Sequence, residues 1–153
     1  MSDPVEKKFW DAARASRASE VSSLLRDHPK IDVNWADHNQ WTPLHVASFL
    51  GHVEVAKLLL AHPDINVNLK NESGQTPFLS GCGNGHVSVV RVLLKDPRVD
   101  VTLDDDGRTP LWWASRYGHH EVIESLIASG RDLGDIKNKR GERLGCWQRL
   151  HST

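Results

Sequence analysis

The chain has 153 residues, of which 39% are hydrophobic and 25% are charged, a composition that suits one folded core and excludes a disordered or fibrous protein. Nineteen basic and 20 acidic residues give a net charge of -1, so the strong positive field that gathers nucleic acid or anionic lipid is missing. No stretch approaches the roughly 20 apolar residues of a membrane span. We therefore expect neither nucleic acid nor a membrane among its partners.

The N-terminus and the cysteines predict the cellular compartment. Residues 1–20 carry charges where a secretory signal needs an apolar run, and the chain has only two cysteines, Cys82 and Cys146. Disulfides are rare in reducing compartments. We expect an intracellular, cytoplasmic protein without disulfides.

The first predicted element, about residues 5–37, is an imperfect copy of the segment that follows it. Three of its features recur 34 residues later, with Ala13 matching Ala47, Glu20-Val21 matching Glu54-Val55, and Leu24-Leu25 matching Leu58-Leu59. This copy lacks the Thr-Pro and Gly-His pairs that mark the later copies. The similarity indicates that an internal repeat begins near residue 5.

The second element, about residues 38–71, is predicted to form two helices joined by a tight turn. Thr42 can accept a hydrogen bond from an amide of the first helical turn, and Pro43 has its φ already set for a helix. Gly51 ends this helix because glycine tolerates a left-handed backbone. A second helix over about 53–61 places its valine and leucines on one side.

The third element, about residues 72–104, repeats the pattern with a weaker first helix. Its Thr-Pro pair begins at Thr76, but Gly81 and Gly83 lie within the predicted helix, and Leu79 stands where the second element has His45. Each glycine costs roughly 1 kcal/mol relative to alanine. We expect this helix to be the least stable of the set.

The fourth element, about residues 105–138, carries two tryptophans in its first helix. Trp112 and Trp113 occupy the positions of His45 and Val46 in the second element. Large rings there face the helix that contains Gly81 and Gly83, so we expect at least one indole to pack against that glycine surface.

The last segment, residues 139–153, contains no fifth copy. A terminal repeat exposes one side of its hydrophobic face, which needs a cover. Either this segment, with Leu144, Trp147 and Leu150, docks as a makeshift cap, or the chain is part of a longer protein. We favour the cap.

Two markers recur in register through these elements, and together they identify a family. The Thr-Pro pairs begin at residues 42, 76 and 109, and the Gly-His pairs at 51, 85 and 118, so both repeat after 34 and then 33 residues. Over about residues 5–138 the chain resembles an ankyrin repeat protein. The resemblance implies an all-α solenoid of about four helix-turn-helix units, with short β-hairpin-like fingers and the first helices lining a concave side. It also implies protein binding without catalysis.

The resemblance places partner contacts at the finger tips and at the residues just before each Gly-His pair. Trp, Tyr and Arg dominate binding hot spots because they bury much area while keeping a polar handle. The predicted partner-binding residues are Trp41, Phe49, Leu50, Asn84, Arg108, Arg116 and Tyr117. The alternative for Phe49 and Leu50 is packing against the small side chains at 15–16 of the preceding unit.

Catalytic and metal sites find little support in the sequence. Of the nine histidines, His45, His52, His86 and His119 occupy repeat-signature positions, and the others show no zinc-site spacing with cysteine. The acidic run at 104–106 does not form a calcium loop, because the residues at the first and last positions of such a loop are not acidic here. Cys82 near His86 is the one pairing suited to nucleophilic catalysis, and no residue is placed to orient that histidine. We expect no enzyme activity, metal, cofactor or small-molecule substrate.

We therefore predict a monomeric, non-catalytic adaptor or scaffold that binds another protein through its concave face and finger tips. The alternative is a regulatory or inhibitory subunit, or an excised domain, of a larger enzyme. The identity of the protein partner is not encoded in the fold, because the fold fixes where contacts occur and the side chains fix with whom.

Overall fold

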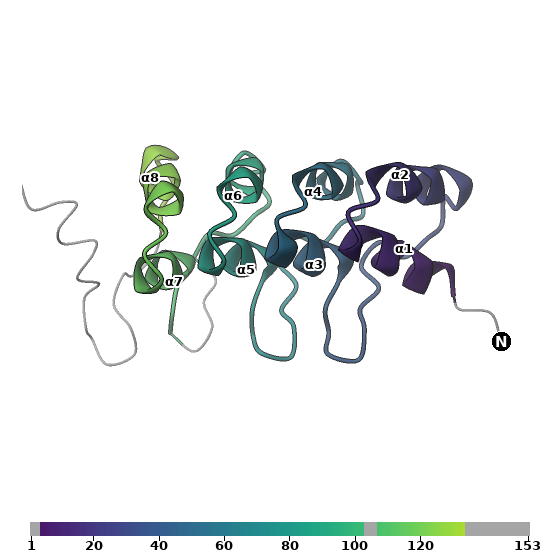
Figure 1. Cartoon of the computed structure of the whole chain (residues 1–153), viewed down its shortest axis with the longest axis horizontal. Helices are drawn as coiled ribbons and strands as arrows, with labels where there is room; N and C mark the ends of the chain where they lie inside the picture. The colour runs from purple at the N-terminus through teal and green to yellow at the C-terminus, as the bar shows by residue number, and fades with distance from the viewer. Residues whose placement is uncertain (1–3, 103–106, 134–153) are drawn as a thin grey trace, which may run out of the picture.

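The computed structural model describes residues 4–102 and 107–133, and within them the chain folds into eight helices arranged as four antiparallel pairs (Figure 1). The first pair is α1 (Val5–Arg14) with α2 (Ala18–Asp27), and the second is α3 (Pro43–Leu50) with α4 (Val53–Leu60). The third is α5 (Pro77–Gly83) with α6 (Val87–Leu94), and the fourth is α7 (Pro110–Arg116) with α8 (His120–Ala128). The predicted all-α repeat solenoid is confirmed.

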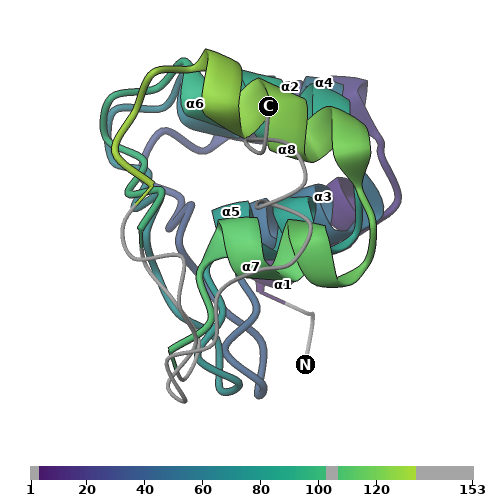
Figure 2. The same ribbon diagram turned by 90° about the vertical axis from the view of Figure 1, so that its left-hand side faces the viewer.

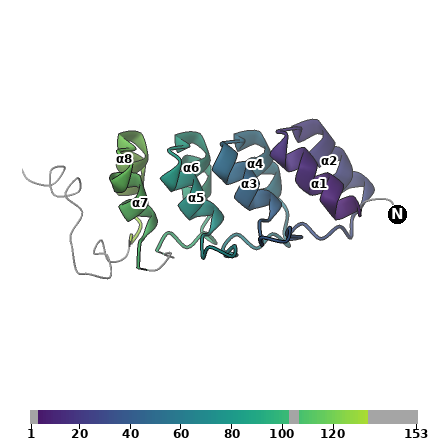
Figure 3. The ribbon, with the colours of Figure 1, turned by 60° about the horizontal axis from the view of Figure 1, so that its bottom comes forward.

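The helices form two layers. Figure 2 shows α1, α3, α5 and α7 in one layer, here called the inner layer, and α2, α4, α6 and α8 in the other, the outer layer. Each helix packs on its partner and on the equivalent helix of the next pair, so the four pairs stand in a row in chain order (Figure 3). The connecting loops project from one edge beside the inner layer.

The loops before the Thr-Pro pairs are closed by turns and contain no strand in the described residues, so the expected β-hairpin-like fingers are not confirmed. The Asp37 amide donates to the Trp41 carbonyl at 3.1 Å, and the Asn71 amide donates to the Gln75 carbonyl at 2.9 Å. One bond ties neighbouring loops together, from the Glu72 amide to the carbonyl of residue 39 at 3.1 Å. The finger residues 103–106, including the acidic run, lie outside the described residues, as does the predicted cap at 139–153.

Each Thr-Pro pair begins an inner-layer helix in the predicted way. The hydroxyls of Thr42, Thr76 and Thr109 accept hydrogen bonds of 3.2 to 3.3 Å from the amides three residues later, and a proline follows each threonine. Gly51 then ends α3 in a left-handed conformation with a φ of 79°. Local chemistry thus fixes where these helices start and stop.

The core repeats with the sequence. Four valines at equivalent positions of the outer-layer helices, Val21, Val55, Val89 and Val122, are at most 1% exposed. Full burial of one such side chain stabilises the fold by roughly 1.5 to 3 kcal/mol. Because every pair contributes the same positions, one continuous core runs the length of the stack.

Polar side chains join neighbouring pairs at regular intervals. The amide group of Asn34 donates to the Asp64 carbonyl and its oxygen accepts from the Asn66 amide, at 2.9 and 2.8 Å. One repeat later, Asn68 makes the same two bonds to Arg98 and Asp100, both at 2.9 Å. These bonds set the spacing between pairs at the edge where the outer-layer helices end.

The histidines of the Gly-His pairs have the structural role expected of them. Nε2 of His52, His86 and His119 lies 2.8 to 3.0 Å from a carbonyl oxygen at the end of the preceding inner-layer helix. A carbonyl oxygen only accepts, so each Nε2 donates a proton to the bond. These hydrogen bonds connect each helix pair to the pair before it. Among the described residues no helix is both long and apolar enough to span a membrane.

Candidate partner-binding face

Exposed apolar side chains gather on the inner layer. Of the four large hydrophobic side chains that are exposed in the described part of the chain, three lie at the C-terminal ends of inner-layer helices: Phe49 (41% exposed), Leu50 (42%) and Tyr117 (58%). The fourth, Ile127, is on α8 in the outer layer. Grouped exposed apolar side chains mark interaction surfaces, whereas single ones are ordinary.

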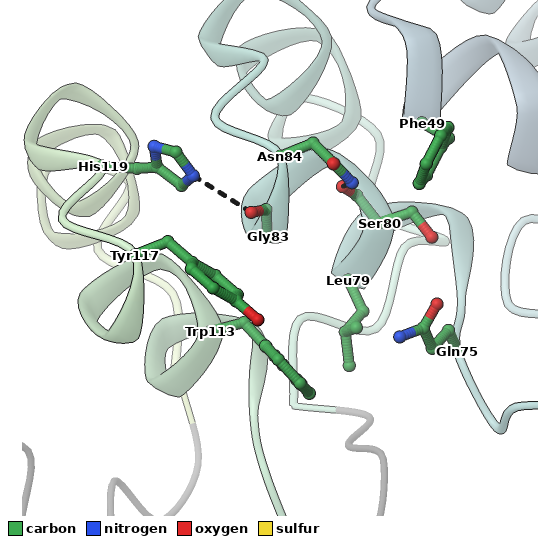
Figure 4. Close-up of a pocket in the computed structure, with 9 residues that line it drawn as sticks. All are labelled: Phe49, Gln75, Leu79, Ser80, Gly83, Asn84, Trp113, Tyr117 and His119. Atoms are coloured by element: carbon green, nitrogen blue, oxygen red, sulfur yellow. Dashed lines mark hydrogen bonds between the residues drawn. The ribbon is translucent and has the colours of Figure 1, made fainter.

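A cavity of about 560 Å³ opens between these side chains (Figure 4). Phe49 of α3 lines one side, Trp113 and Tyr117 line the other at α7, and α5 lies between them. The remaining lining residues are Gln75, Leu79, Ser80, Gly83, Asn84 and His119. The cavity therefore has aromatic walls on the two repeats that flank α5, and between them a base of aliphatic, small and polar groups.

The cavity exists because Gly83 has no side chain. Gly83 is the repeat equivalent of Phe49 in α3 and of Arg116 in α7. A methyl group added at Gly83 would meet only the Cβ of Trp113, at 3.7 Å. Gly81, by contrast, faces the helices around it, where an added methyl group would touch Val90 at 3.6 Å.

Tryptophan side chains build the α7 wall. The rings of Trp113 and Tyr117 stack with centroids 5.7 Å apart, and the Trp112 ring meets Trp113 edge-on at 5.1 Å. The guanidinium of Arg108 lies over both indoles, 5.1 Å from Trp112 and 5.7 Å from Trp113. The Cβ of Trp113 lies beside Gly83, but the neighbours of Gly81 are Val90 and Val89, so the packing of an indole ring against the glycine surface stays a prediction.

Trp41 supports the α3 wall from behind. Its ring meets the Phe49 ring edge-on at 5.2 Å and is tilted against the His45 ring at 5.9 Å. Its carbonyl accepts a 2.8 Å hydrogen bond from Nε1 of Trp10. Trp41 is half-buried, so it positions Phe49 and exposes only part of its own surface.

Two polar groups among the lining residues lack a hydrogen-bond partner. The Ser80 hydroxyl and Nε1 of Trp113 are buried, and neither has a hydrogen-bond partner within residues 4–102 and 107–133. Asn84 uses its Nδ2 to donate to the Ser80 carbonyl at 2.7 Å, which leaves its Oδ1 open. Buried polar groups are nearly always paired, so these two are exceptions, as are the Ser48 hydroxyl and Nδ2 of Asn71 away from the cavity.

Comparison with known proteins agrees with the fold. The family model described as ankyrin repeats (3 copies) matches residues 9–71 and 62–137. The chain belongs to the ankyrin repeat family. Proteins of this family are generally protein-interaction modules and typically non-catalytic. No curated protein shows significant sequence similarity to the chain.

The ankyrin fold brings some of the predicted binding residues together and separates others. Phe49, Asn84 and Tyr117 line the cavity. Leu50 and Arg116 are exposed at the ends of α3 and α7 beside it. Trp41 lies behind Phe49, and Arg108 lies over the indoles at the start of α7.

Sequence analysis did not select Gln75, Leu79, Ser80, Gly83, Trp113 and His119 as contact residues, although they line the cavity. The available signal was the glycine at position 83, where the equivalent residues of the neighbouring repeats are large.

The cysteine and histidine considered for catalysis do not fit that role. Cys82 is fully buried, and this burial raises the pKa of its thiol well above the ordinary value, so the nucleophilic thiolate is disfavoured. Nε2 of His86 is held by the Phe49 carbonyl at 2.8 Å. Within residues 4–102 and 107–133, no three His, Cys, Asp or Glu side chains gather as a metal site would require.

Proposed function

We propose that this ankyrin repeat protein is a non-catalytic adaptor or scaffold that binds a partner protein on its inner layer and loop tips. The observation that carries the proposal is the grouping of three exposed large hydrophobic side chains, Phe49, Leu50 and Tyr117, on this layer. Exposing them to water is unfavourable by roughly 25 cal/mol for each Å² of apolar surface. A partner that covers them recovers this free energy.

The chemistry of the face supports protein recognition. An apolar centre with aromatic side chains, rimmed by polar and cationic groups, is typical of protein interfaces. The proposed contact residues are Trp41, Phe49, Leu50, Asn84, Arg108, Arg116 and Tyr117. Trp113, which stacks on Tyr117, joins them.

The test compares an inner-layer variant with an outer-layer control. Phe49→Ala combined with Tyr117→Ala removes two exposed rings, whereas Ile127→Ala removes a side chain of similar exposure from the outer layer. We expect wild type and the Ile127→Ala variant to recover the same proteins from native cell extract, and the double variant to lose them. Circular dichroism spectra of all three should coincide. Equal recovery by the double variant would contradict the proposal.

A further inference from the structure

Among the described residues, the inner-layer helices that bound the cavity carry no negative charge. Helices α3 and α5 contain no charged residue, and α7 contains one, Arg116. None of the nine lining residues is an aspartate, glutamate, lysine or arginine. An uncharged cavity in such a setting takes its electrostatic character from the charges at its rim.

Arg108 supplies one of these charges next to the α7 wall. Its guanidinium lies over the rings of Trp112 and Trp113, and its side chain forms no ion pair within the described residues. A guanidinium stacked on an aromatic face keeps its N–H groups directed outward along its edge. Those groups can hold a carboxylate through two parallel hydrogen bonds.

Arg116 supplies the second charge at the other end of α7. It is exposed, adjoins Tyr117, and likewise has no ion pair in the part of the chain that the structure describes. The seven residues of α7 span roughly 10 Å at 1.5 Å per residue. An extended peptide covers that length in about three residues at 3.3 Å each.

The cavity beside the α7 wall suits an apolar side chain together with its main chain. Its volume, about 560 Å³, lies within the roughly 300 to 1,000 Å³ typical of ligand pockets. Figure 4 shows the Ser80 hydroxyl directed toward the space between Phe49 and Gln75. This hydroxyl has no partner among the described residues and is closed to solvent, so it can donate to a main-chain carbonyl of the occupant once its side chain rotates into the cavity.

We infer that the occupant is an extended segment of a partner protein with one large apolar side chain and at least one carboxylate within about three residues of it. The apolar side chain enters the cavity over Gly83, and Arg108 or Arg116 pairs with the carboxylate. This inference rests on the proposed function and adds to it the chemical class of the partner.

The test uses a library of random twelve-residue peptides displayed on phage, selected on the immobilised full chain. The variant that fills the cavity is Gly83→Phe. It places in α5 the residue that α3 carries at the equivalent position, so it is compatible with the repeat. We expect the selected peptides to share an apolar residue with a nearby aspartate or glutamate. Synthetic copies should bind Gly83→Phe at least tenfold more weakly than wild type.

The charge arm measures the same synthetic peptides on Arg108→Gln combined with Arg116→Gln. We expect their Kd to rise at least tenfold, and to rise with salt for wild type. The matched control is Arg26→Gln, which removes an exposed arginine from α2 in the outer layer and should leave Kd unchanged.

Four results would overturn the inference. If the selected peptides are basic, or bind the double arginine variant as tightly as wild type, the protein does not recognise a carboxylate at this face. If Gly83→Phe does not weaken peptide binding, the apolar side chain does not enter the cavity. A library that yields no enriched peptide would contradict both the cavity contact and the carboxylate contact. The proposed function fails separately, when the Phe49 and Tyr117 variant still recovers the same proteins from extract.

Discussion

Helices α3 and α5 begin with the same Thr-Pro pair and occupy equivalent places in neighbouring repeats, yet they are built differently. In α3, Nδ1 of His45 accepts from the Thr42 amide at 3.2 Å, and its Nε2 lies 2.9 Å from the Gln75 carbonyl. In α5 the equivalent residue is Leu79, which has no such bonds. At the C-terminal end, α3 carries a phenylalanine where α5 carries Gly83.

This difference shows how one repeat can hold the stack together while the next provides room. The bonds of His45 join α3 to the following loop, whereas the missing side chain at Gly83 leaves the cavity open. Because α5 packs between α3 and α7, its neighbours support a helix that is poor in its own stabilising features. Substitutions at the features that distinguish the two repeats, or at the joint between them, should therefore change the stability of the protein to different extents.

The largest effect is expected at the joint between the two repeats. Gly51 has a left-handed backbone, and a methyl group added there would lie 2.6 Å from Nδ1 of His86. Gly51→Ala should therefore lower the free energy of unfolding by about 2 to 3 kcal/mol, since it adds a clash to the backbone strain. Urea denaturation measures this change.

The control is Gly118→Ala, where the backbone is also left-handed but an added methyl group would meet nothing within 4 Å. Gly118→Ala should lower the free energy of unfolding by about 1 kcal/mol, which is the cost of the backbone strain alone. If both variants lose the same free energy of unfolding, the close contact with His86 does not add to the cost of a side chain at this joint.

Converting α3 to the α5 pattern should have the next largest effect. His45→Leu removes a fully buried side chain whose bonds satisfy the Thr42 amide and the Gln75 carbonyl. We expect a loss of about 2 kcal/mol in the free energy of unfolding. The matched change Leu79→Met in α5 should cost less than about 1.5 kcal/mol. If His45→Leu lowers the free energy of unfolding less than Leu79→Met does, His45 does not stabilise α3 in the way described.

The same histidine predicts a pH dependence. Burial lowers the pKa of His45 below its ordinary value of 6.5, although its hydrogen bond to Gln75 raises it in part. As pH falls below about 6.5, the unfolded chain binds a proton that the folded chain does not, so stability should decrease until the lower folded pKa is passed. His45→Leu should lose less stability over this range. Parallel curves of unfolding free energy against pH for the two proteins would contradict this role.

The smallest effect is a gain in stability in α5. At Gly81 an added methyl group would make ordinary contacts of 3.6 to 3.9 Å with Val90, Val89 and the Ser48 carbonyl. Gly81→Ala should therefore stabilise the protein by up to about 1 kcal/mol through helix propensity. Thermal and urea unfolding should both show the increase. Destabilisation would mean that the contacts around Gly81 are already too close for a side chain.

The repeat and its helix ends were predictable from sequence because they depend on local chemistry. Thr42 and Gly51 act within their own helix or turn, and their spacing recurs along the chain. The cavity was less predictable because it depends on three helices at once. The glycine at position 83 signalled a gap, but the space is bounded by the directions that Phe49 and Trp113 take.

Trp41 illustrates the same limit. Its position before a Thr-Pro pair predicted a contact residue, but burial depends on the neighbours that meet it in space. Trp10, His45 and Phe49 surround it and leave it half-buried.

The most direct test of the proposed binding face is a ¹H–¹⁵N spectrum of the full chain titrated with the tightest peptide from the phage selection. We expect the indole N–H signal of Trp113 and the amide signal of Tyr117 to shift on binding, while the amide signal of Ile127 in the outer layer stays in place. Shifts confined to the outer layer, with Trp113 and Tyr117 unmoved, would contradict the proposed binding face.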